Sequence, residues 1–160
     1  MMRSLLDLFL IGAGATVCID LWSVLLKKAF GIRSLDYCLL GRWVLHMPAG
    51  RIMHASIGGA APKAHECAAG WISHYGIGMT FAVTFGAFVG DRWLHAPTLG
   101  PALAFGVATV VVPMFVMQPA LGMGVAASKA PDPALARLKS LGTHAVFGAG
   151  LYVSAELARL

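Results

Sequence analysis

Residues 46–75 read HMPAGRIMHASIGGAAPKAHECAAGWISHY and hold four of the six histidines of the chain. From Trp71 onward this stretch passes into an apolar run that is long enough to cross a bilayer. A polar segment that leads directly into such a run is typical of the border between a loop and a membrane-spanning helix. The stretch therefore predicts a membrane protein whose other segments are further spans and short connections.

The composition points the same way. Of the 160 residues, 58% are hydrophobic and 12% are charged, whereas soluble domains average about 25% charged residues. A chain this short cannot hide so much apolar surface in a soluble core, so we expect a lipid bilayer to cover it. The sequence contains no aromatic-rich basic motif, and its Lys and Arg residues fit membrane loops, so no nucleic-acid partner is expected.

Four apolar segments are long enough to cross a hydrocarbon core of roughly 30 Å at about 1.5 Å per helical residue. They comprise residues 5–26, 70–93, 101–122 and 138–158. Pro113 and Pro119 lie inside the third segment and predict a kinked helix, because proline has no N–H for the carbonyl four residues earlier. We expect an all-α membrane protein: one transmembrane domain over residues 1–160, with four helices in a compact bundle.

The first loop contains an interfacial segment, residues 34–60. Its apolar side chains recur every four residues, at Leu35, Leu39, Trp43 and Met47. Ser34 is a suitable N-cap, and Pro48 ends the pattern. This spacing predicts an amphipathic helix that lies at the membrane surface.

The three cysteines, Cys18, Cys38 and Cys67, are widely spaced and form no C-x-x-C motif. A disulfide framework is therefore not expected.

The distribution of basic residues predicts the orientation. With four spans, the termini and the loop at 94–100 share one side, which carries three Lys or Arg residues, and the other side carries nine. Since cytoplasmic loops are enriched in Lys and Arg, both termini should face the periplasm.

Several motifs together cover nearly the whole chain: GAGATVCIDLW, RSLDYCLLGRW, GWISHYGIGMTFA, PTLGPAL, MQPALGMGVAAS, HAVFGAGLY and the spaced His46 and His54. As a set they resemble the bacterial membrane family called domain of unknown function 2938. The resemblance implies a small protein of the bacterial inner (plasma) membrane. It implies no activity, cofactor or site residue.

A polar layer is the strongest functional signal in the sequence. Asp20, His74 and His144 each lie about 6 to 9 Å from the predicted cytoplasmic end of their spans, counted at about 1.5 Å per residue. Met117 and Gln118 lie near the cytoplasmic end of the third span. An ionised group inside a span costs at least about 2.5 kcal/mol and tends to mark function. The competing interpretation is structural hydrogen bonding, in which Asp20 pairs with a histidine or with the nearby Thr16 and Ser23.

A second candidate set comprises His46, His54 and Glu66. Their spacing matches no closed zinc motif, and the segment lacks the second histidine of H-E-x-x-H. The competing interpretation is a polar rim against lipid headgroups. Met114, Met117 and Met123 are soft metal donors, although their spacing is more typical of flexible packing around a proline kink.

These residues predict a non-enzymatic role, in which the protein binds or moves a small solute, proton or metal ion. One alternative is a redox subunit that holds haem or a metal through His74 and His144. Another is a structural subunit, either in a homo-oligomer or with a partner in a larger membrane complex. The sequence contains no catalytic signature and identifies no cofactor.

Overall fold

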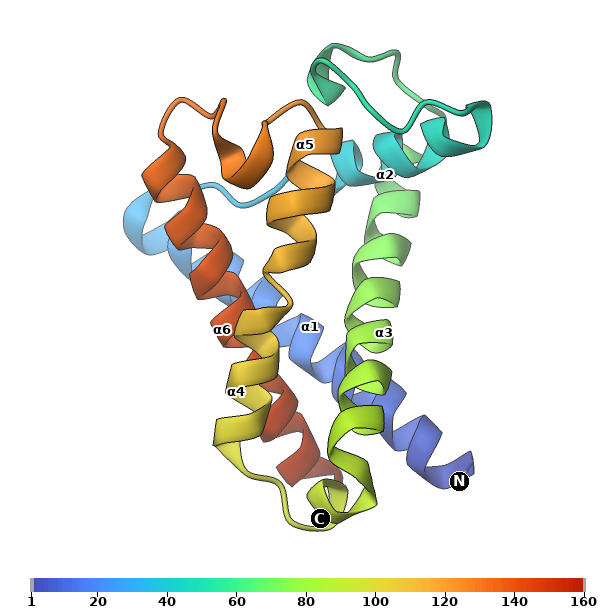
Figure 1. Ribbon diagram of the computed structural model, residues 1–160, viewed down its shortest axis with the longest axis vertical. Helices are drawn as coiled ribbons and strands as arrows, with labels where there is room; N and C mark the ends of the chain where they lie inside the picture. The colour runs from blue at the N-terminus through green and yellow to red at the C-terminus, as the bar shows by residue number, and fades with distance from the viewer. Residues whose placement is uncertain (1, 160) are drawn as a thin grey trace. The chain divides into compact units, whose positions relative to one another are not determined.

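The computed structural model describes residues 2–159, with side chains from Leu5 onward, and every regular element in that range is helical (Figure 1). The α-helices are α1 (Met2–Phe30), α2 (Tyr37–His46), α3 (Glu66–His95), α4 (Leu99–Ala108), α5 (Gln118–Ala120) and α6 (Pro133–Ala158). The shorter elements are the 3₁₀ helices η1 (Met47–Ala49), η2 (Ile57–Gly59) and η4 (Val125–Ala127) and the π-helix η3 (Pro113–Met117). The all-α expectation is confirmed.

Three helical segments are long and apolar enough to cross a membrane. They are Leu5–Phe30, Glu66–His95 and Leu99–Ala120. The sequence predicted a fourth span at 138–158. Its helix, α6, is not among the three, because Lys139, His144 and several small residues lower its mean hydropathy.

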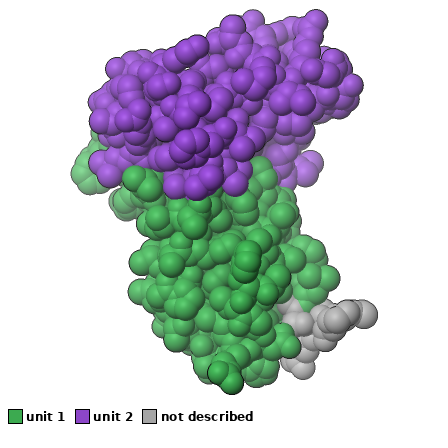
Figure 2. All heavy atoms as spheres, in the orientation of Figure 1, with its two compact units in different colours: residues 1–34, 75–109, 141–160 green, residues 35–74, 110–140 purple. Residues whose placement is uncertain are grey.

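The chain divides into two compact units, shown in different colours in Figure 2. Unit 1 comprises residues 1–34, 75–109 and 141–160, and unit 2 comprises residues 35–74 and 110–140. Each unit has its own buried apolar cluster.

Unit 1 packs α1 against α3 and α6 at glycines. A Cβ added to Gly12 of α1 would lie 2.7 Å from Met79 Cα of α3, and one added to Gly150 of α6 would lie 2.9 Å from Ala15 Cα of α1. Small residues are what allow helices to approach this closely in a membrane. The buried cluster around these contacts contains Ile11, Ala15, Ala82, Phe85, Trp93, Ala102, Phe147, Leu151 and Ala155.

The third predicted span is interrupted, as its prolines indicated. The helix begins at Leu99, α4 ends at Ala108, and a π-helix starts at Pro113. Pro113 leaves the carbonyl of Thr109 without its usual helical donor, and Pro119 does the same to the carbonyl of Phe115. The α-helical hydrogen-bond pattern therefore changes at two points within this segment.

Unit 2 begins with α2, whose N-cap is Asp36 rather than the predicted Ser34. Asp36 Oδ1 accepts a hydrogen bond of 2.9 Å from the backbone N–H of Cys38. A carboxylate satisfies a free helical N–H and also interacts favourably with the helix dipole, so it is the stronger cap here.

The predicted apolar stripe of α2 packs against protein. Trp43 belongs to the buried cluster of unit 2, together with Leu40, Ile57, Ala120 and Leu121. Leu35, Leu39 and Met47 pack against the same cluster. The stripe therefore contributes to the core of unit 2, and its position relative to a membrane surface stays a prediction.

Candidate functional site

The closest helix contact in unit 2 joins α2 to the first turns of α3. Four residues on each helix have the same spacing: Tyr37, Cys38, Gly41 and Arg42 on α2, and Glu66, Cys67, Gly70 and Trp71 on α3. His74 of α3 completes the set. We call this set the α2–α3 clasp. A Cβ added to Gly41 would overlap the carbonyl oxygen of Glu66, and one added to Gly70 would overlap that of Tyr37. The two glycines therefore permit the contact.

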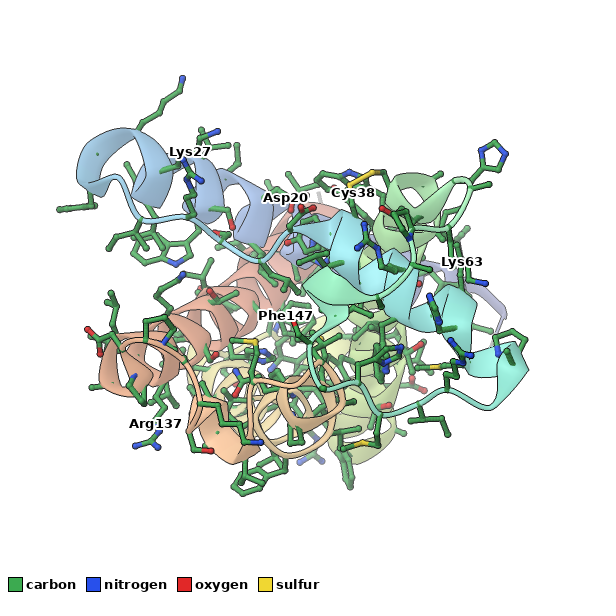
Figure 3. The ribbon with its side chains drawn as sticks, turned by 90° about the horizontal axis from the view of Figure 1, so that it is seen from above. Asp20, Lys27, Cys38, Lys63, Arg137 and Phe147 are labelled. Atoms are coloured by element: carbon green, nitrogen blue, oxygen red, sulfur yellow. A yellow bond between two sulfur atoms is a disulfide. The ribbon has the colours of Figure 1, made fainter. Side chains whose placement is uncertain are left out.

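A disulfide joins Cys38 to Cys67 across the clasp (Figure 3). The expectation of no disulfide was wrong. The two cysteines are 29 residues apart, so nothing local in the sequence marks them as a pair. They come together because the glycine crossing brings their Cα atoms within 3.9 Å.

An ion pair lies beside the disulfide. Arg42 Nε and Nη2 donate to the two carboxylate oxygens of Glu66 at 2.8 and 2.7 Å, and these hydrogen bonds raise the pKa of Arg42. Glu66 also accepts a hydrogen bond of 2.9 Å from the backbone N–H of Lys63. Glu66, a member of the second candidate set, thus has a structural role at the start of α3.

His74 lies at the end of the clasp. Its ring stacks on that of Tyr37, with the ring centres 4.1 Å apart and the planes 22° apart. The ring of Trp71 lies at 5.9 Å from it in an edge arrangement. An aromatic contact of this kind positions the imidazole within unit 2.

Unit 1 contains two polar pairs between helices. Tyr75 Oη of α3 donates to Asp20 Oδ2 of α1 at 2.9 Å. Thr109 Oγ1, just after α4, lies 2.7 Å from His144 Nδ1 of α6 and 2.6 Å from the carbonyl of Gly106. Because Gly106 can only accept, Thr109 donates to that carbonyl, and the proton on His144 Nδ1 completes the second bond.

The register of α1 and α6 places both pairs at similar depth within unit 1. Two contacts indicate the register of these antiparallel helices: the close approach of Gly150 to Ala15, and an ordinary van der Waals contact, 4.0 Å, between the indole ring of Trp22 and the Cβ position of Gly142. Asp20 lies between the two contacts on α1, and His144 lies between them on α6. Two ionisable side chains of the predicted polar layer therefore share one level of unit 1.

The other three predicted residues of the layer, His74, Gln118 and Met117, belong to unit 2. Gln118 is 5% exposed, and its amide nitrogen donates to Ser140 Oγ at 3.1 Å. Its carbonyl oxygen, Oε1, is buried without a hydrogen-bond partner. Met117 ends the π-helix η3 and packs against the cluster of unit 2.

The remaining histidines of the second set form a pair in unit 2. The ring centres of His46 and His54 are 5.1 Å apart, and the ring planes are nearly perpendicular, at 88°. His46 Nε2 lies 3.0 Å from the carbonyl oxygen of Ala61. Both ring nitrogens of His54 are buried without a hydrogen-bond partner.

Sequence reasoning missed the hydroxyl partners, Tyr75 and Thr109. Tyr75 follows His74 directly, and Thr109 stands four residues before Pro113, where a helix loses a backbone donor. Thr109 could have been found from the sequence, because a helix interrupted by proline often exposes polar groups near the interruption. Within residues 2–159 no group of three or more His, Cys, Asp or Glu side chains is arranged to hold a metal ion.

The model of a family described as protein of unknown function, DUF2938, matches residues 9–158. Neither a curated protein nor a solved structure matches the chain.

Proposed function

Because the chain belongs to the DUF2938 family, whose function is unknown, we propose its role from its own residues: it binds or moves a small solute, proton or metal ion through polar side chains inside a membrane. Among these cargoes, a proton fits the described contacts best. The residues that carry the proposal are Asp20 and His144, with their hydroxyl partners Tyr75 and Thr109.

The observation that carries the proposal is the pairing of each ionisable group with a hydroxyl. A carboxylate in a span costs at least about 2.5 kcal/mol relative to an apolar residue. Asp, Glu and His side chains form proton relays inside membrane bundles. In unit 1 the phenol of Tyr75 donates to Asp20, and the hydroxyl of Thr109 lies 2.7 Å from His144 Nδ1, so each of the two side chains has a hydroxyl beside it that can pass a proton on.

We further propose that the protein is a multi-pass protein of the bacterial inner membrane, with α6 as a fourth span. The 26 residues of α6 reach about 39 Å at 1.5 Å per residue, more than a hydrocarbon core needs. The proposed orientation has both termini in the periplasm, since nine basic residues against three favour a cytoplasmic first loop. In this arrangement α2 lies at the cytoplasmic membrane surface.

The function is tested with purified protein in liposomes that contain an entrapped pH-sensitive dye. A potassium gradient with valinomycin drives proton entry. Asp20→Asn should abolish the proton flux and leave the thermal unfolding temperature within a few degrees of wild type. Asp91→Asn, an exposed carboxylate in the last turns of α3, is the matched control and should conduct normally.

Equal flux through the wild type and Asp20→Asn would overturn the proposal. So would a change in stability alone, which is what a purely structural subunit predicts. Tyr75→Phe separates the two roles further. It removes the hydrogen-bond donor and keeps the carboxyl, so it should shift the pH dependence of flux without abolishing it.

A further inference from the structure

We propose that His46 and His54 bind one soft monovalent metal ion, Cu(I), in unit 2. The inference rests on the buried histidine pair and is independent of the proposed role of Asp20. Three features support it: the hydrogen bond of His46, the buried nitrogens of His54, and the separation of the two rings.

His46 is held ready as a ligand. Its side chain is 3% exposed, and Nε2 lies 3.0 Å from the carbonyl oxygen of Ala61. Since a carbonyl can only accept, Nε2 is the donor in this bond, which leaves Nδ1 as the nitrogen that can bind an ion. Metal-binding histidines commonly use this arrangement, in which one nitrogen donates to a carbonyl and the other binds the ion.

His54 has buried nitrogens that lack partners. Neither Nδ1 nor Nε2 has a hydrogen-bond partner, and both are inaccessible to solvent. A buried polar group without a partner is costly, and native proteins rarely tolerate one without a compensating ligand or function. A metal ion on one nitrogen removes this cost at that atom.

The separation of the rings fits two imidazoles on a single ion. A bound nitrogen lies about 2.0 to 2.1 Å from the metal, which puts each ring centre roughly 3.2 Å away, and a tetrahedral angle then separates the two centres by about 5.2 Å. The centres of His46 and His54 are 5.1 Å apart.

The backbone around the pair is fixed before any ion binds. The N–H of His54 donates to the carbonyl of Ala120 at 2.9 Å. On the other side, Arg42 Nη1 donates to the carbonyls of Ile57, Gly58 and Ala60, next to the carbonyl that holds His46. Little of the binding energy is therefore spent on ordering the loop.

The donor set selects the ion. An imidazole binds a metal ion as a neutral ligand, so a monovalent ion brings less uncompensated charge into a partly buried site than a divalent one. Unit 2 also contains thioethers, since Met47, Met117 and Met123 pack against its buried apolar cluster, and sulfur donors favour Cu(I). Because no third His, Cys, Asp or Glu joins the pair among the described residues, a thioether or an external ligand must complete the coordination.

The experiment is an anaerobic titration of the purified, chelator-stripped protein in detergent. A chromogenic Cu(I) chelator competes for the metal, and Zn(II) is titrated in a parallel sample. We expect one Cu(I) per chain in the wild type and at least tenfold weaker binding for His46→Asn and for His54→Asn. Zn(II) should bind more weakly than Cu(I).

His65→Asn is the matched control. His65 is exposed and has a φ of 61°, a conformation that asparagine also adopts readily, so its Cu(I) affinity should equal that of the wild type. Equal affinity of wild type and His54→Asn, or an equal loss in His65→Asn, would overturn the proposal. Asp20→Asn should bind Cu(I) normally, which separates this site from the proposed proton function.

X-ray absorption of the Cu(I)-loaded wild type provides a test that needs no variant. The proposed site predicts the scattering pattern of two imidazole rings. A spectrum without imidazole scattering would refute the assignment even if a histidine variant failed to fold.

Discussion

Replacing Gly70 by alanine should weaken the α2–α3 clasp, and the same replacement at Gly76 provides the control within the same helix. A Cβ at Gly70 would overlap the carbonyl oxygen of Tyr37 and would lie 3.2 Å from the backbone nitrogen of Gly41. A Cβ at Gly76 would meet nothing within 4 Å. Both variants gain the helix preference of alanine over glycine, about 0.5 to 1 kcal/mol.

The difference in the free energy of unfolding between the two variants gives the cost of overpacking, because both variants gain the same helix preference of alanine over glycine. Overpacking typically costs about 1 to 3 kcal/mol. The obstructing atoms here belong to backbone and cannot rotate away, so we expect a difference of about 3 kcal/mol. Gly76→Ala should then be slightly more stable than wild type, and Gly70→Ala about 2 kcal/mol less stable.

The free energy of unfolding can be measured by titration from a mild detergent into SDS, followed by far-ultraviolet circular dichroism. The measurement is made with the Cys38–Cys67 disulfide intact and again after its reduction, because the bond could hold the helices together despite the added methyl group. If Gly70→Ala proves as stable as Gly76→Ala under both conditions, the glycine crossing is not a close contact and the reasoning fails.

Two further predictions concern the disulfide and the orientation. Cys67→Ser opens a loop of 29 residues and should lower the free energy of unfolding by about 3 to 4 kcal/mol on the chain-entropy estimate, whereas Cys18→Ser, at the free cysteine of α1, should change it little in the same SDS titration. Ala96→Cys, in a background that lacks Cys18, should react with an impermeant maleimide on intact cells. With the first loop in the reducing cytoplasm, acid-trapped Cys38 and Cys67 should be thiols in growing cells and a disulfide in air-oxidised membranes. Protection of Ala96→Cys, together with an oxidised pair in growing cells, would reverse the orientation.

The long helices of this fold could be predicted from hydropathy, because apolar length is a local property. Residues 5–26 and 70–93 lie inside α1 and α3, and each observed helix extends a few residues past its prediction. Lys27 lies past the predicted first span and is still helical, because a helix can extend beyond its apolar part. Pro113 correctly indicated the break after α4, because a missing N–H has the same effect in any context.

The contacts between distant segments could not be predicted. The pairing of Cys38 with Cys67 depends on how closely Gly41 and Gly70 allow two helices to approach, and periodicity contains no information on that distance. For the candidate site, sequence depth predicts Asp20 and His144 at one level, because helical rise is constant, and their shared layer stays a prediction. It gave no means to find Tyr75, whose contact with Asp20 depends on helix rotation.

The α2–α3 clasp also sets an order of events during synthesis. All its residues lie between Tyr37 and His74, so it can close while the C-terminal half of the chain is still on the ribosome. At about 5 to 20 residues per second, the rest of the chain follows within roughly 4 to 17 seconds. The backbone of His54 must wait for that later half, because its hydrogen-bond acceptor is the carbonyl of Ala120. Substitutions in the clasp therefore affect a step that can occur on the nascent chain. Substitutions around Ala120 affect a later step, in which His54 pairs with the second half of the chain after the clasp has formed.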